Sequence, residues 1–82
     1  AVRDLAQRAD VMIIIGGKNS SNTKQLHSIA KEYCPQSYHI ESKEDLHREW
    51  FDAKELCGIS AGASTPDWII DEVIAEITRI SS

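Results

Sequence analysis

The stretch VMIIIGGKNSSNTKQL, residues 11–26, contains the pattern that decides the fold. Its first five residues form a continuous apolar run, which is typical of a short strand buried on both faces of a sheet. Two glycines, a lysine and four polar residues follow directly at 16–22. A helical pattern begins after them, so the stretch predicts a strand, a polar loop and a helix in direct succession.

The helix after this loop is predicted from Thr23 to Tyr33, because four apolar residues recur on one helical face. They are Leu26, Ile29, Ala30 and Tyr33. Pro35 then ends the helix, since proline cannot continue the backbone hydrogen bonding. Residues 1–9 have the same helical spacing and indicate the end of an earlier helix. The chain begins without Met, so we expect it to be part of a longer protein.

Two further strands and two further helices follow by the same reasoning. Residues 37–41 indicate a second, less hydrophobic strand, and residues 56–60 a third. Ser42 with Asp45 resembles a capping box, which predicts a helix over the segment that holds Leu46, Trp50 and Phe51.

The last helix is predicted from the residues that open it. Thr65, Pro66 and Asp67 supply an N-cap, a proline at the first helical position and an acidic first turn. Its apolar residues recur at helical spacing over 70–80.

The order of elements predicts the fold class. Strands that alternate with helices pair in parallel through crossover connections. We therefore expect an α/β fold, a three-layer α/β/α sandwich with a short parallel sheet, in one domain over residues 1–82. One core is expected between the sheet and its helices, formed by seven apolar residues. They are Ile13, Ile14, Leu26, Ile59, Ile70, Val73 and Ile74.

Composition limits the classes of partner. The net charge of −4 argues against a nucleic-acid surface, and the longest apolar run of five residues is far too short to span a membrane. We therefore expect this chain to bind neither a nucleic acid nor a membrane. Cys34 and Cys57 lie outside any C-x-x-C motif, so they are interpreted as free structural thiols. The three histidines show no metal-ligand spacing.

Two loops with similar chemistry follow two of the predicted strands. The first is GGKNSSN at 16–22 and the second is SAGASTP at 60–66. Each combines glycine with hydroxyl groups at a helix N-terminus, where free N–H groups and the helix dipole favour an anion. Ligands of parallel sheets bind beyond the carboxyl ends of the strands. The two loops together therefore predict a clamp for a ligand with two phosphate groups.

The residues available for the clamp are those that capping does not use. One of Asn19, Ser20 or Ser21 should cap the helix that is predicted from Thr23 to Tyr33. The other hydroxyl groups and Asn22 then remain as donors. Thr65 is the expected cap of the last helix, which leaves Ser64. The alternative is that both loops are ordinary polar turns, because Ser, Asn and Gly also suit turns.

Two other functions have some support in the sequence. The segment GISAG at 58–62 matches the G-x-S-x-G motif of a serine hydrolase. All three histidines precede Ser60, whereas that fold places its histidine after the serine, so the hydrolase is the weaker hypothesis. A free-standing, flavodoxin-like anion-binding module remains a second alternative.

Three segments carry a resemblance to a known family. They are GGKNSSNTKQL at 16–26, the tryptophan of HREWF at 47–51, and GISAGASTPDWIIDEVI at 58–74. With these segments the chain resembles, from about Asp10 to Ile77, the C-terminal domain of the LytB/IspH family of hydroxymethylbutenyl diphosphate reductases.

The resemblance implies a function for the longer protein. Enzymes of this family remove a hydroxyl reductively from an allylic diphosphate in the non-mevalonate isoprenoid pathway, and for this protein the resemblance implies a bacterial, cytoplasmic location. Three similar α/β domains surround a 4Fe-4S cluster that an electron donor such as ferredoxin or flavodoxin reduces. The products are isopentenyl and dimethylallyl diphosphate. The residues that grip the substrate diphosphate match Ser20, Ser21, Asn22 and Ser64 of this chain.

The same resemblance implies what this chain lacks. The family's three cluster cysteines, its diphosphate-binding histidines and its proton-delivering glutamate all lie upstream of the matched region. Cys34 and Cys57 therefore do not match cluster ligands. We expect this chain to carry no catalytic residue and no metal ligand of its own, to bind no cluster alone, and to be inactive alone.

Overall fold

The structure is a computed structural model that describes residues 2–52 and 55–81. Its helices are α1 (Val2–Arg8), α2 (Ser21–Tyr33) and α3 (Asp67–Ser81). Its strands are β1 (Val11–Ile15), β2 (Ser37–Ile40) and β3 (Cys57–Ala61). Each element agrees with its predicted position to within two residues, apart from the segment between β2 and β3.

The three strands form one parallel sheet in the order β2-β1-β3. β1 lies in the centre and all five of its residues are fully buried, as its continuous apolar run predicts. Ile15, its last residue, lies in register with Ile40 of β2 and Ala61 of β3. The three strands therefore end at the same edge of the sheet.

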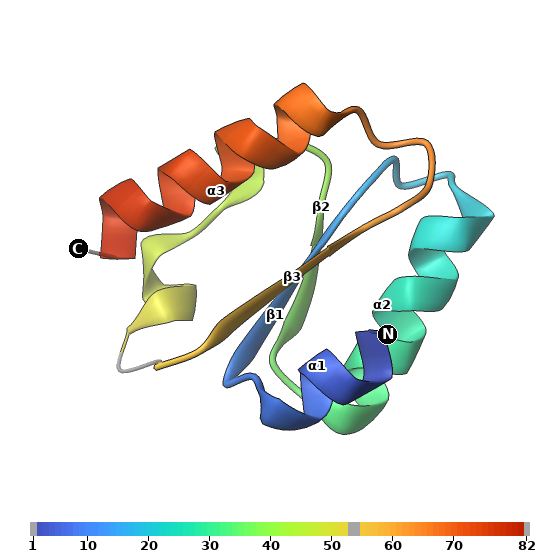
Figure 1. Ribbon diagram of the computed structural model, residues 1–82, viewed down its shortest axis with the longest axis horizontal. Coiled ribbons are helices and arrows are strands. Elements are labelled where there is room, and N and C mark those ends of the chain that lie inside the picture. Colours follow the sequence, from blue (N-terminus) through green and yellow to red (C-terminus); the bar gives the residue numbers. More distant parts are fainter. Residues whose placement is uncertain (1, 53–54, 82) are drawn as a thin grey trace.

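The helices cover the two faces of the sheet separately, as Figure 1 shows. α1 and α2 pack on one face over a core of five buried residues: Ala6, Met12, Ile14, Ala30 and Cys34. α3 covers the other face over a second core: Val11, Ile13, Ile15, Ile40, Phe51, Val73 and Ile77. This arrangement confirms the three-layer α/β/α sandwich.

The prediction of a single core is wrong. Successive side chains of a strand point to opposite faces, so Ile13 and Ile14 belong to different cores on the two sides of the sheet. Ile74, one of the seven predicted core residues, is 44% exposed on α3.

The predicted helix between β2 and β3 is also wrong. This segment forms two short 3₁₀ turns, η1 (Lys43–Asp45) and η2 (Arg48–Phe51), with extended backbone at His47 between them. The carboxylate of Asp45 accepts from Ser42 N–H (3.4 Å), as in the predicted capping box. The interruption lets Leu46, Trp50 and Phe51 all pack toward the sheet, and the ring of Trp50 stacks on Tyr38 with the centroids 4.0 Å apart.

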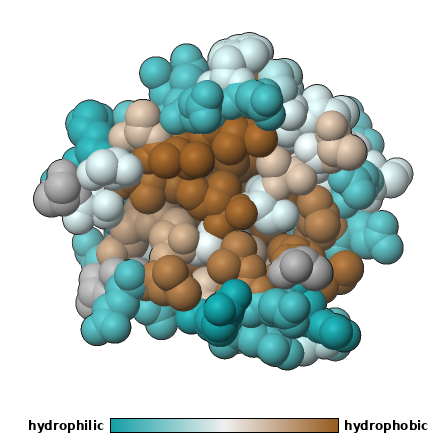
Figure 2. Space-filling view, in the orientation of Figure 1, coloured by the Kyte–Doolittle hydropathy of each residue, from teal (hydrophilic) through white to brown (hydrophobic). Residues whose placement is uncertain are grey.

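β3 forms one edge of the sheet and pairs with β1 alone among the strands that the structure describes. Figure 2 shows apolar residues gathered in the middle of the face along which β3 lies, between polar residues above and below. Leu56 and Ile74 are both 44% exposed. Within the described ranges, none of the helices has the length and apolar character needed to cross a membrane.

The two-sided burial of β1 generates a stability prediction. Ile14→Ala should lower the free energy of unfolding by about 2–5 kcal/mol, because it leaves a cavity in a fully packed core. The matched control Ile74→Ala should change it far less, since this side chain is 44% exposed. Urea unfolding followed by tryptophan fluorescence measures both. A near-neutral Ile14→Ala would contradict the central position of β1.

Candidate functional site

The site is formed where β1 and β3 end side by side. β1 leads into α2 on one face of the sheet, whereas the neighbouring β3 leads into α3 on the other (Figure 1). Two adjacent parallel strands whose connections leave on opposite faces open a crevice between their loops, and this is where α/β proteins bind ligands. The two loops that the sequence singles out, 16–22 and 60–66, meet at this point.

In the first loop, Ser20 is the residue that caps α2. Its Oγ accepts a hydrogen bond from Thr23 N–H (3.3 Å), and its carbonyl accepts from Lys24 N–H (3.0 Å). Asn19 and Ser21, the two alternatives from the sequence, do not take this role. Ser20 is half-buried, while Ser21 and Asn22 are exposed in the first turn of the helix. The Ser20 oxygen accepts in the cap, so its hydroxyl proton remains available for a ligand.

In the second loop, the predicted cap at Thr65 is wrong. The Thr65 hydroxyl donates to the Ile15 carbonyl at the end of β1 (3.1 Å), because that buried carbonyl lies beside the loop. Pro66 supplies the carbonyl that accepts from Ile70 N–H (3.4 Å) at the start of α3. Ser64 is exposed and takes no part in this arrangement, as the sequence reasoning expected.

One hydrogen bond joins the two loops directly. Ala63 N–H donates to Oδ1 of Asn22 across the crevice (2.9 Å). The bond leaves the Nδ2 donors of Asn22 for another acceptor and places Ser64, the next residue, opposite the start of α2. The structure thus joins Asn22, at the start of α2 with Ser20 and Ser21, to the loop that contains Ser64.

Two glycines let the loops approach the start of α2. A Cβ atom on Gly16 or on Gly62 would overlap Oγ1 of Thr23, which is fully buried. Neither glycine has a φ in the left-handed region, so the lack of space, and not the backbone conformation, requires glycine here. Gly17, in contrast, has open space around its α-carbon.

Sequence reasoning missed two residues near this edge. His39 Nε2 donates to the Gly16 carbonyl (2.9 Å), and the Glu41 carboxylate accepts from Lys18 N–H (3.2 Å). Both residues follow from the parallel pairing of β2 with β1, which local sequence does not reveal. A cavity of about 220 Å³ lies next to the crevice. Its lining is Gly16, Gly17, Glu41, Ser64, Thr65, Pro66 and Ile69. Of the four predicted site residues, only Ser64 lines it.

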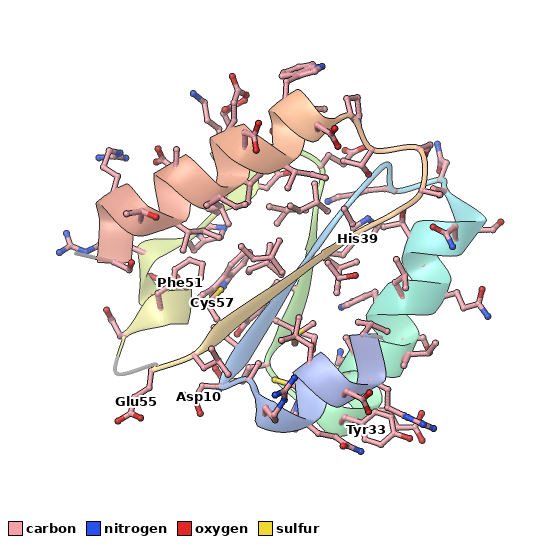
Figure 3. The ribbon with its side chains drawn as sticks, in the orientation of Figure 1. Asp10, Tyr33, His39, Phe51, Glu55 and Cys57 are labelled. Carbon is pink, nitrogen blue, oxygen red and sulfur yellow. The ribbon has the colours of Figure 1, made fainter. Side chains whose placement is uncertain are left out.

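The cysteines do not fit an iron–sulfur cluster. Cys34 is buried on the α1–α2 side, where its thiol contacts the carbonyls of Ala9 and Gln36. Cys57 lies on the opposite side of the sheet, beside Phe51 (Figure 3). Cluster ligands must converge on one point, whereas these two thiols lie on opposite faces of the sheet. Burial raises the pKa of Cys57 to about 11. Within residues 2–52 and 55–81, no group of three His, Cys, Asp or Glu side chains could hold a metal ion.

The geometry also argues against a serine hydrolase. Ser60 lies inside β3 and is paired with Ile14. The nucleophile of that fold sits instead on a sharp turn between strand and helix, which exposes its hydroxyl.

The crowding around Thr23 predicts unequal effects for two neighbouring glycines. Gly16→Ala should lower the free energy of unfolding by about 1–3 kcal/mol, because the added methyl group overlaps a buried side chain. The matched control Gly17→Ala meets nothing within 4 Å and should have little effect. Thermal and urea unfolding of both variants measure the difference. Equal effects would contradict the close approach of Gly16 to α2.

The raised pKa of Cys57 predicts that its thiol reacts slowly with alkylating agents. At pH 9 iodoacetamide should alkylate the folded protein at Cys57 about 50-fold more slowly than the urea-unfolded protein, because the thiolate is scarce. From pH 9 to 11 the folded chain keeps a proton that the unfolded chain loses, so the stability associated with Cys57 falls as pH rises. The Cys57→Ala variant measures the background alkylation at Cys34. Equal rates in both states would contradict the burial.

Comparison with known proteins identifies the family of this chain and supports its fold. The reductase of Campylobacter concisus, 4-hydroxy-3-methylbut-2-enyl diphosphate reductase, is 68% identical over 80 residues, which are 98% of this chain and 29% of that protein. The enzyme of the same name from Nautilia profundicola is 60% identical over 81 residues, 99% of this chain and 29% of that protein. The chain thus spans about 29% of the length of these curated relatives.

Two solved structures share the fold. One is (E)-4-hydroxy-3-methyl-but-2-enyl diphosphate reductase, the terminal enzyme of the non-mevalonate pathway, with a TM-score of 0.93 and 58% identity over 95% of this chain and 28% of that one. The other is the reductase from Plasmodium falciparum, with a TM-score of 0.88 over 95% of this chain and 24% of that one. At 20% identity the second shows the fold alone. The family model described as LytB protein matches residues 1–78. This chain therefore belongs to the LytB family.

Proposed function

We propose that this domain is part of a 4-hydroxy-3-methylbut-2-enyl diphosphate reductase and supplies the loops that hold the substrate diphosphate. The relatives that carry this name support the activity. The observation that carries the proposal is the hydrogen bond between Asn22 and Ala63, which joins the two polar loops across the crevice. In this proposal Ser20, Ser21, Asn22 and Ser64 each donate a hydrogen bond to a diphosphate oxygen.

The start of α2 is suited to an anion. The first N–H groups of a helix have no partner within it, and the helix dipole places partial positive charge there. α1 and α3 carry Asp4 and Asp67 in their first turns, whereas the first turn of α2 contains no acidic residue. A bound diphosphate would supply the negative charge that this helix end lacks.

The charge of the chain shapes how such an anion is held. With a net charge of −4, the domain as a whole does not attract a diphosphate. Lys18 and Lys24 are exposed at this end of the molecule and add local positive charge. The remaining attraction comes from hydroxyl, amide and backbone donors that the two loops hold in place, so affinity depends on their positions.

The other parts of the reaction are proposed to come from the remainder of the longer protein. A 4Fe-4S cluster and an electron donor such as ferredoxin or flavodoxin belong to the reductase that we propose. Cys34 and Cys57 lie on opposite faces of the sheet and do not fit the cluster, so its ligands would lie outside this chain. Cytoplasmic location and the absence of nucleic-acid and membrane partners stay predictions.

The clamp is tested with variants of the full-length protein. Ser21→Ala, Asn22→Ala and Ser64→Ala should each weaken binding of the allylic diphosphate by about 10- to 150-fold, because a hydrogen bond to a charged group contributes about 1.5–3 kcal/mol. Ser20 needs a different change, since Ser20→Ala would also remove the helix cap. Ser20→Gly removes the hydroxyl at a cost of only a few tenths of a kcal/mol to the cap.

Isothermal titration measures these affinities, and steady-state turnover of the parent protein tests the reaction itself. Ser28→Ala, which changes an exposed serine later in α2, is the matched control and should bind as the parent does. If Ser20→Gly and Ser64→Ala also bind like the parent, the loops are only turns. Binding of diphosphate without any turnover would favour the anion-binding module instead.

A further inference from the structure

Thr23 has an unusual environment for a polar side chain. It is the third residue of α2 and is fully buried. Among the residues that the structure describes, its Oγ1 has no hydrogen-bond partner. An unpaired buried hydroxyl is unfavourable for folding, so its position calls for a physical reason.

The reason lies in what Oγ1 contacts. It is the atom nearest to a Cβ built on Gly16 and also the atom nearest to one built on Gly62. One side-chain oxygen therefore lies against both glycines, and each glycine is the first residue after its strand, in one of the two loops of the site. A hydroxyl oxygen is smaller than a methyl group, so it can occupy the narrow space between two backbones where an apolar branch would push them apart.

The predicted binding residues are placed by the same few atoms. Thr23 N–H donates to Ser20 Oγ (3.3 Å), which fixes the cap of α2. The preceding residue, Asn22, accepts from Ala63 N–H across the crevice (2.9 Å). A change at Thr23 would therefore reach Ser20 and Asn22 through α2, and Ser64 through Gly62.

We propose that Thr23 is a positioning residue of the diphosphate site: its side chain, held between Gly16 and Gly62, sets the separation of Ser20, Ser21 and Asn22 from Ser64. This inference rests on the proposed function. Thr23 touches no ligand itself, because it is fully buried. Its effect passes through the two loops, and a donor displaced by a fraction of an ångström forms a weaker bond to the diphosphate.

The test is steady-state kinetics of the full-length reductase with 4-hydroxy-3-methylbut-2-enyl diphosphate. Thr23→Ala should raise KM about 10-fold and change kcat far less, because it loosens the grip on the non-reacting diphosphate. Thr23→Ser keeps Oγ1 between the glycines and should restore the KM of the parent. Thr78→Ala, a control on the exposed part of α3 whose hydroxyl bonds to the Ile74 carbonyl, should leave both constants unchanged.

A merely structural role would give a different result. Ile77→Ala removes buried volume on the opposite face of the sheet and should lower the melting temperature without raising KM. If Thr23→Ala also lowers the melting temperature while KM stays that of the parent, the positioning role is wrong. A Thr23→Ser variant as impaired as Thr23→Ala would equally overturn it, because Oγ1 would then not be the spacer.

A double variant tests the contact itself. Gly62→Ala should raise KM, because the new methyl group overlaps Oγ1. Once Thr23→Ala removes that oxygen, the nearest atoms to the methyl group are Asn22 Oδ1 at 3.4 Å and the Cβ of residue 23 at 3.5 Å, which is ordinary contact. The double variant should therefore have a lower KM than Gly62→Ala alone. At Gly16 the Cβ of residue 23 stays 3.1 Å away, so the same rescue should be weaker there.

These outcomes separate the two proposals. A parent enzyme without turnover of this diphosphate, or Ser20→Gly and Ser64→Ala variants that bind it normally, would overturn the proposed function and this inference with it. If those variants lose affinity but the effects of Thr23→Ala and Gly62→Ala on KM simply multiply, only the positioning role fails.

Discussion

The carbonyl oxygen of Ile15, at the end of the central strand, holds the second loop of the site in place. It accepts from Gly62 N–H (2.9 Å) and from the Thr65 hydroxyl (3.1 Å). Ile15 is fully buried, and a buried carbonyl without a partner is costly. The loop after β3 therefore folds back onto β1, and every contact between the two loops depends on this arrangement.

The proposed site would hold a diphosphate within an acidic domain. Its donors are hydroxyl, amide and backbone groups at the start of α2 and in the loop after β3, and each is useful only at the correct distance from an oxygen. Packing beneath the loops then matters as much as the donors themselves. The buried contacts of Thr23 with Gly16 and Gly62 provide that packing.

Much of the fold could be predicted because it depends on local patterns. The apolar run at 11–15 gave a central strand, and the 3.6-residue periodicity after Thr23 gave α2. The segment at 43–51 could not be predicted in this way, since two 3₁₀ turns replace a helix so that three large side chains reach the sheet. The capping box forms, but tertiary packing outweighed the helical pattern that follows it. Likewise, the partner of the Thr65 hydroxyl is a carbonyl fifty residues away.

The sequence by itself determined the elements outside residues 43–51 and the position of the two polar loops, because periodicity, caps and glycine-rich turns act over a few residues. Only the tertiary structure decided the strand order β2-β1-β3, which depends on pairing between distant segments. That order places Asn22 beside Ala63, 41 residues later in the chain. The tertiary structure also decided that the Thr23 side chain lies between Gly16 and Gly62. A contact of one side chain with two separate backbone segments has no local signature in the sequence.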